Sequence, residues 1–117
     1  MKTQQTNSQN LVEFLHEIAL DSLENSKKYH AKEIVSLAEW FDGRSDSLEN
    51  SAEWIQQSME LGNRTPAALV EFLLERAEKS AVESTRWLDK GNQRMVDWFE
   101  GRSSGFKMAA EFARELI

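Results

Sequence analysis

Glu13 and His16 have the spacing of two ligands in a carboxylate-bridged di-iron site, where a glutamate and a histidine three residues apart share one helix face. That chemistry needs the same motif on a second helix, together with two further glutamates. The chain repeats itself 58 residues later, and there Leu74 stands where the second histidine belongs. We therefore expect no metal and no cofactor. His30 lies on the same helical face two heptads away, so a pair of partly buried, hydrogen-bonded histidines is the simpler interpretation.

The other polar residues give no pattern typical of catalysis. Serines are numerous, but the strand that a nucleophile elbow requires is not expected in this chain. The five glycines are scattered rather than gathered in a phosphate-binding loop, and cysteine is absent. Solvated helix faces explain the many pairs of carboxylates. We expect no catalytic residues and a protein that is not an enzyme.

The aromatic residues are the better candidates for a functional surface. Two adjacent aromatic side chains on a helix point about 100° apart, so both are buried only where neighbouring elements cover a wide arc. Aromatic side chains that stay partly exposed mark a partner, a lipid surface or an oligomer interface. The alternative is that they close the ends of the bundle core. The candidate binding residues are Trp40, Phe41, Trp54, Trp98, Phe99 and Phe112.

Composition predicts the class of protein that positions these residues. The chain has 117 residues, one proline and a net charge of −6, and it is rich in strong helix formers. Residues 1–58 hold 5 Lys/Arg and 10 Asp/Glu, whereas residues 59–117 hold 9 and 10, so the acidity lies in the first half. We expect no direct binding to nucleic acid, which needs a basic face. No apolar run approaches the roughly 20 residues of a membrane span, and the polar start lacks the apolar core of a secretion signal, so a cytoplasmic protein is expected.

The most specific feature of the sequence is an internal duplication. At an offset of 58 residues, Leu11–Leu15 matches Leu69–Leu73, and Trp40–Ser45 matches Trp98–Ser103 except for Asp in place of Glu. There are 17 identities over 49 aligned pairs without a gap. Chance similarity between amphipathic helices does not repeat a Trp-Phe-acid-Gly-Arg-Ser motif at one offset. The chain therefore contains two tandem copies of one unit.

The duplication defines the expected organisation. We expect a single helical domain over residues 1–117, with a polar N-terminal segment at 1–10, a first unit at 11–59 and a second at 69–117. The predicted fold class is all-α. Each unit reads as a helix-turn-helix, so the two tandem units predict an elongated antiparallel helical bundle.

Capping residues suggest where the helices begin and end. Thr65 is a good N-cap and Pro66 suits the first helical position, while Asn7 occupies the equivalent position of the first unit. Gly43 and Gly101 follow apolar helical stretches, as residues at helix C-termini do. These signals predict helices at 8–43, 46–61, 66–100 and 104–117.

Two of these helices are long for a chain of this size. A helix of about 35 residues spans roughly 50 Å. Either the molecule is elongated, or the long helices break near the polar stretches at 25–32 and 91–94.

Heptad spacing predicts the seam between the helices. Val70, Ala77 and Ser84 recur every seven residues, and a second row interleaves with them, formed by Leu74, Ala81 and Leu88. The small residues at mid-helix bury little apolar area, so we expect weaker packing there, or a seam completed by another chain.

The stretch from Leu61 to Ser80 resembles the middle of bacterial phasins, which coat polyhydroxyalkanoate granules. The residues that carry the resemblance are Thr65-Pro66, Val70-Glu71-Phe72, Glu75, Ala77 and Glu78, within residues 61–90. Phasins commonly combine a small-residue loop with Ser/Thr-Pro and a long amphipathic helix rich in Ala and Glu. The resemblance implies a helical, non-enzymatic protein that covers a hydrophobic granule surface.

Two other functions remain open from the sequence. The chain could be a small acidic helical adaptor or inhibitor, for example a phage- or defence-related one, that binds a protein partner through its aromatic patches. It could also be a structural homo-oligomer.

Overall fold

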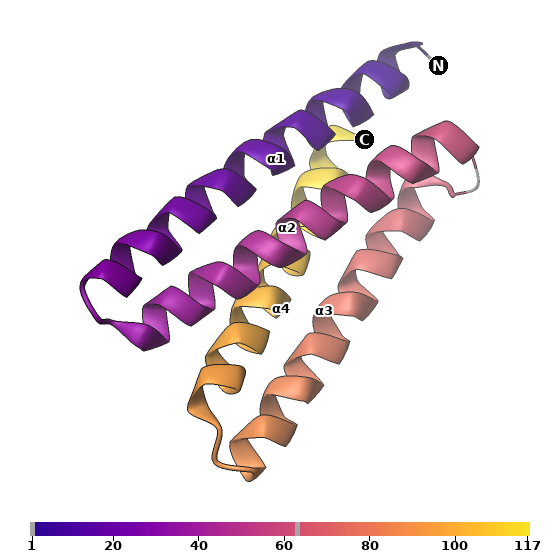
Figure 1. Ribbon diagram of the computed structural model, residues 1–117. Coiled ribbons are helices and arrows are strands. Elements are labelled where there is room, and N and C mark those ends of the chain that lie inside the picture. The colour runs from indigo at the N-terminus through magenta and orange to yellow at the C-terminus, as the bar shows by residue number, and fades with distance from the viewer. Residues whose placement is uncertain (1, 63) are drawn as a thin grey trace.

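The computed structural model describes residues 2–62 and 64–117, with side chains described from residue 8 onward. Within these ranges the chain forms four helices and no strand: α1 (Lys2–Ala31), α2 (Val35–Leu61), α3 (Pro66–Asp89) and α4 (Gln93–Leu116). They pack as an antiparallel bundle of 47 × 28 × 20 Å (Figure 1). The prediction of an elongated all-α bundle is confirmed.

The predicted helix ends in the middle of each unit are wrong. Gly43 lies inside α2 and Gly101 inside α4, so neither residue terminates a helix. The breaks fall instead at residues 32–34 and 90–92, close to the polar stretches that offered the alternative. Both breaks use a left-handed residue at the same position of the repeat, Glu33 with φ of 62° and Gly91 with φ of 73°. Both glycines lie instead where α2 and α4 meet.

The predicted start of α3 is confirmed. The Thr65 side chain accepts a hydrogen bond from the backbone N–H of Ala68 at 3.1 Å, and Pro66 occupies the first turn. Asn92 caps α4 in the same way by accepting from the N–H of Met95 at 3.2 Å. Asn7 is not an N-cap, because α1 begins at Lys2 and runs through it.

Each sequence unit folds as a helical hairpin, α1 with α2 and α3 with α4, and the hairpins meet chiefly where α2 crosses α4 (Figure 1). The two backbones touch at this crossing. A Cβ atom on Gly43 would overlap the carbonyl oxygen of Trp98, and one on Gly101 would overlap the carbonyl oxygen of Trp40. Glycine is therefore required at both positions for close approach rather than for turning the chain. The two contacts are 58 residues apart in both partners, which gives the molecule an approximate two-fold symmetry.

Buried serines hold each hairpin together where large apolar side chains are lacking. Ser26 donates to the carbonyl oxygen of Ala38 at 2.9 Å, and Ser45 donates to that of Ala19 at 2.8 Å. The second hairpin repeats both bonds at the 58-residue offset, from Ser84 to Val96 at 3.2 Å and from Ser103 to Ala77 at 2.9 Å. A small hydroxyl lets two helices approach while it satisfies its own hydrogen-bonding need.

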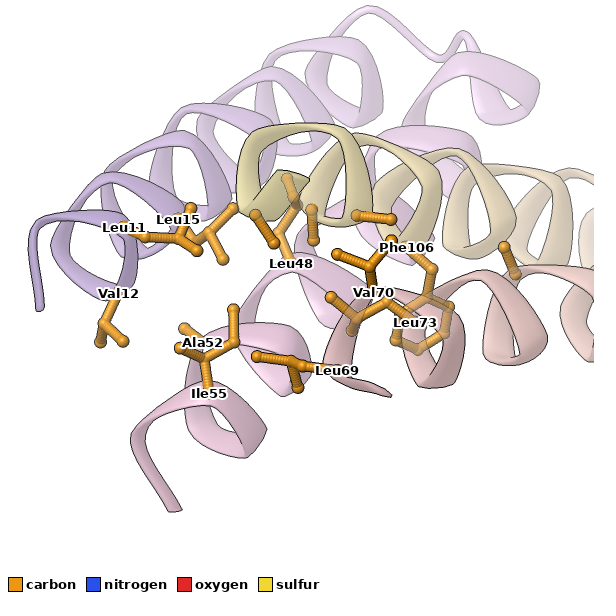
Figure 2. Close-up of a cluster of buried hydrophobic side chains, with 14 of the residues drawn as sticks. Leu11, Val12, Leu15, Leu48, Ala52, Ile55, Leu69, Val70, Leu73 and Phe106 are labelled. Carbon is orange, nitrogen blue, oxygen red and sulfur yellow. The ribbon is translucent and has the colours of Figure 1, made fainter. Parts of the chain in front are cut away.

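The large apolar side chains gather in the half of the molecule that contains the termini. Leu11 and Leu15 from α1 meet Leu48 from α2, Leu73 from α3 and Phe106 from α4 (Figure 2). All five are fully buried. The apolar core is therefore concentrated at one end of the bundle, and the serine-bonded halves of the hairpins extend away from it.

The predicted seam is half correct. Val70, Ala77 and Ser84 are buried, but Leu74 and Leu88 are exposed. The second buried row of α3 is instead formed by Leu73 and Ser80. The sequence pattern is compatible with a row through Leu74 or a row through Leu73. The position of α4 decides which of the two rows is buried.

Replacing Gly43 or Gly101 with alanine tests the crossing. In an exposed helix this change raises stability by about 1 kcal/mol. Here the new methyl group meets backbone atoms that cannot rotate away, so the free energy of unfolding should fall by about 2–3 kcal/mol, seen as a lower urea midpoint. Gly62→Ala is the control: its surroundings are open and only its φ of 61° opposes the change, for an expected loss of about 1 kcal/mol. Increased stability in both crossing variants would contradict the close approach.

Exchanging residues between the two turns tests the left-handed positions. Glu33→Gly should raise the free energy of unfolding by about 1 kcal/mol, because a side chain disfavours the left-handed conformation. Gly91→Glu should lower it by a similar amount. Lys32→Gly, one residue earlier where φ is not positive, serves as the control and should bring no increase in the thermal midpoint. Equal effects at 32 and 33 would rule out backbone strain as the cause.

Candidate functional site

The candidate binding residues occupy three kinds of position. Trp40 and Trp98 are half-buried at the crossing, where their own carbonyl oxygens face the glycines. The Arg44 guanidinium lies over the Trp40 ring at 5.4 Å from its centroid, and Arg102 lies over Trp98 at 5.5 Å. These two tryptophans thus belong to the joint between the hairpins, at equivalent positions of the repeat.

Trp54 and Phe112 border the apolar core. Trp54 stacks on Phe106 at 5.6 Å between ring centroids and meets Phe72 edge to face at 5.0 Å. Phe112 meets Phe14 edge to face at 4.8 Å. Each edge-to-face pair joins one unit to the other, and the two pairs are again related by the 58-residue offset. Both residues pack against the core, as the alternative to a binding role expects, and both remain half-buried.

Phe41 and Phe99 directly follow the two tryptophans of the crossing. Each meets its neighbouring tryptophan edge to face, at 5.1 Å from Trp40 and 5.0 Å from Trp98. Phe41 also stacks on Tyr29 across the first hairpin, with ring centroids 5.6 Å apart and planes 9° apart. Phe41 therefore connects the crossing with the end of the first hairpin.

We name residues 27–37 the first hairpin tip and residues 85–95 the second hairpin tip, because they contain the α1–α2 and α3–α4 turns. Ile34, Val35 and Leu37 in the first tip are 41%, 42% and 41% exposed. Leu88 in the second tip is 59% exposed, beside half-buried Trp87. The candidate list from the sequence contains none of these residues. The matches of Tyr29 with Trp87 and Leu37 with Met95 in the duplication were the signal that could have found them.

Charged side chains at the crossing tie the hairpins together. Arg102 of α4 forms an ion pair with Asp46 of α2. Burial raises the pKa of Asp46, against the opposing effect of Arg102, and Asp42 raises it further. Burial also lowers the pKa of Arg102 and of Arg44. Arg44 donates a hydrogen bond to the Met108 sulfur at 3.1 Å, so both arginines link α2 with α4.

The histidines do not form the expected pair. His16 is half-buried and its Nδ1 lies 2.8 Å from the Glu49 carboxylate, whereas His30 is exposed. Glu13 is also exposed. The described residues contain no group of three or more His, Asp or Glu side chains that could hold a metal ion.

Residues 101–105 have the letters of a catalytic motif but not its geometry. Residues 101–105 read Gly-Arg-Ser-Ser-Gly, which has the letters of the Gly-x-Ser-x-Gly nucleophile elbow. An elbow places its serine in a sharp turn between a strand and a helix. Ser103 is instead buried inside the continuous helix α4, where its hydroxyl donates to the carbonyl oxygen of Ala77. This serine therefore has the geometry of a helix-packing residue.

Comparison with known proteins finds no match: no protein-family model, no curated protein and no solved structure is similar to the chain. The phasin resemblance rests on residues 61–90 alone.

Alanine at Trp54 and at Trp87 distinguishes aromatic residues of the core from those of the tips. Trp54→Ala should lower the free energy of unfolding by about 2–3 kcal/mol, because it removes contacts with Phe72, Phe106 and the core. Trp87→Ala, at a tip outside that core, should lower it by less than about 1 kcal/mol. Chemical denaturation followed by circular dichroism gives both values. Equal losses would show that the second tip is as important to stability as the core.

Proposed function

We propose that this chain is a non-enzymatic binding protein that attaches to hydrophobic surfaces through its two hairpin tips, in the manner of a phasin. The observation that carries the proposal is the exposure of large apolar side chains at both tips. Turns between helices are usually polar, yet here the tips present Ile34, Val35, Leu37 and Leu88 to the surroundings. Exposed apolar groups in the turn of each repeat unit are typical of an interaction surface.

The topology supports simultaneous attachment by both tips. In an up-down-up-down bundle the first and third turns lie at the same end. Figure 1 shows the α1–α2 and α3–α4 turns directed away from the termini and from the α2–α3 connection. The apolar core lies toward the termini, so the tips can contact a surface while the core stays intact. Acidic residues elsewhere on the chain would keep coated particles apart.

Droplet partitioning tests the proposal. The protein should move from the aqueous phase onto polyester or oil droplets with a change in tryptophan fluorescence. Because the four helices already span most of the chain, helicity should change little on binding. The double variant Leu37→Ser/Leu88→Ser should weaken partitioning at least tenfold, since it removes two of the four exposed apolar contacts.

The matched control removes two exposed leucines from the opposite end. Leu61 and Leu116 are 71% and 40% exposed and lie at the C-terminal ends of α2 and α4. Leu61→Ser/Leu116→Ser should partition like the wild-type chain. A protein that remains in the aqueous phase, or two double variants with equal losses, would refute attachment through the tips.

A protein partner is the second candidate, and one difference between the hairpins favours it. In the first hairpin, His16 and Glu49 bridge α1 and α2. The equivalent residues of the second hairpin are Leu74 and Lys107, and Leu74 is exposed. A surface groove of about 540 Å³ lies further along α3 and α4, lined in part by Ala81 and Lys107. A helix of an adaptor's partner, or of a second copy in a homo-oligomer, would fit beside Leu74 and along this groove.

One variant tests both the adaptor and the homo-oligomer, and the readout distinguishes them. Leu74→Asp should abolish binding of a stoichiometric partner, or dissociate an oligomer in sedimentation equilibrium, while leaving the fold intact. Val82→Asp is the control, because Val82 is similarly exposed but points about 80° away from Leu74 on α3. Variants at Trp40 or Trp98 are unsuitable, since both residues belong to the crossing. A monomer with no partner affected by Leu74→Asp would exclude this candidate.

A further inference from the structure

Both hairpin tips are basic in a chain that is acidic overall. The first tip holds three lysines and one glutamate, and the second holds two arginines, one lysine and one aspartate. Each tip therefore carries a net charge of +2, while the whole chain carries −6. The sequence places most of the acidity in the first half, whereas in the fold both basic segments lie on the side away from the termini, at the ends of two diverging hairpins (Figure 1).

The cations of the tips are combined with aromatic rings. The Lys28 ammonium lies 5.8 Å from the centroid of the Tyr29 ring, and the Lys90 ammonium lies 4.8 Å from that of Trp87. Tyr29 and Trp87 are equivalent in the duplication. Tyrosine and tryptophan with neighbouring lysines favour the boundary between water and lipid, where the ring meets acyl chains and the ammonium meets head groups.

The lysines of the first tip are available for an external anion. In the part of the chain that the structure describes, no carboxylate lies within ion-pair distance of Lys27, Lys28 or Lys32, and all three are exposed. In the second tip both arginines are engaged, Arg86 with Glu83 and Arg94 with Glu39, both near 2.9 Å. The first tip therefore offers more free positive charge, and the second offers the most exposed leucine of the two.

We propose that the two tips dock the protein on an anionic lipid surface, with lysines at the head groups and the exposed aliphatic and half-buried aromatic side chains in the acyl boundary. This inference rests on the proposed function and names its surface. A bare polymer or oil supplies no anion for the lysines, whereas phospholipid head groups do. Nucleic acid would pair with the lysines but would leave Ile34, Val35 and Leu37 in water.

The geometry also explains why the unit occurs twice. A single small apolar tip binds a membrane weakly, as a single acyl chain does. Two tips on one rigid body turn the second contact into an intramolecular step, which raises the overall affinity without a new contact. Attachment would be peripheral, and none of the described helices is long and apolar enough to cross a membrane.

The experiment is sedimentation of the full chain with sucrose-loaded vesicles, made either of phosphatidylcholine alone or with about a third phosphatidylglycerol. We expect binding to the anionic vesicles, at least tenfold weaker binding to the neutral ones, and a loss of binding as salt is raised from 50 to 500 mM. The triple variant Lys27→Gln/Lys28→Gln/Lys32→Gln should bind at least tenfold more weakly, because each basic residue near an anionic membrane contributes about fivefold. Tryptophan fluorescence should shift to the blue on binding, because Trp87 lies in the second tip.

The matched control removes three exposed basic residues outside the tips, as Lys79→Gln/Lys107→Gln/Arg114→Gln. It changes the net charge equally and should bind within twofold of the wild-type chain. Equal losses in both triple variants would show that overall charge, and not the tips, determines binding, and would overturn the inference. Insensitivity to lipid charge, or vesicle binding abolished by a short duplex DNA at equimolar phosphate, would overturn it as well.

The droplet assay separates failure of this inference from failure of the proposed function. Partitioning onto uncharged droplets without binding to anionic vesicles would leave the hydrophobic-surface function standing and refute the lipid surface. Absence of binding in both assays would refute both.

Discussion

The whole architecture depends on backbone contact between α2 and α4. At Gly43 and Gly101 the carbonyl oxygens of Trp98 and Trp40 occupy the space in which other residues carry a Cβ atom. Such close approach allows weak Cα–H···O contacts and places each tryptophan beside the partner helix. The angle at which the hairpins cross, and hence the direction of both tips, follows from this single point. The arginines that lie over the tryptophans secure it on either side.

Around that crossing the two repeat units are related by an approximate two-fold symmetry within one chain. The serine bonds, the edge-to-face aromatic pairs and the left-handed turn residues all recur at the 58-residue offset. A contact that stabilises one hairpin is therefore present twice. Large apolar residues are concentrated at the terminal end, and toward the tips buried serines join the two helices of each hairpin. This division leaves the tips free to carry side chains that the core does not need.

The two units are most alike where the hairpins cross and differ at exposed positions and at the tips. The residues kept identical include the crossing glycines, the arginines beside them and the serines that bond to facing carbonyls. The residues that differ include His16 against Leu74 and the charged groups of the two tips. The first tip holds three lysines that have no ion-pair partner among the described residues, and the second tip holds an exposed leucine beside a tryptophan. A surface with both anionic and apolar character matches this combination.

The sequence by itself determined the helical class, the duplication and the start of α3, because composition, repetition and the Thr65-Pro66 cap act locally. It also located the repeated aromatic residues. It misassigned Gly43 and Gly101 as helix ends, since a glycine that permits close packing looks the same as one that ends a helix until the facing backbone is known. It overlooked the tips for a related reason. Whether Leu37 or Leu88 is buried depends on where the other hairpin lies, and only the crossing of α2 and α4 decides that.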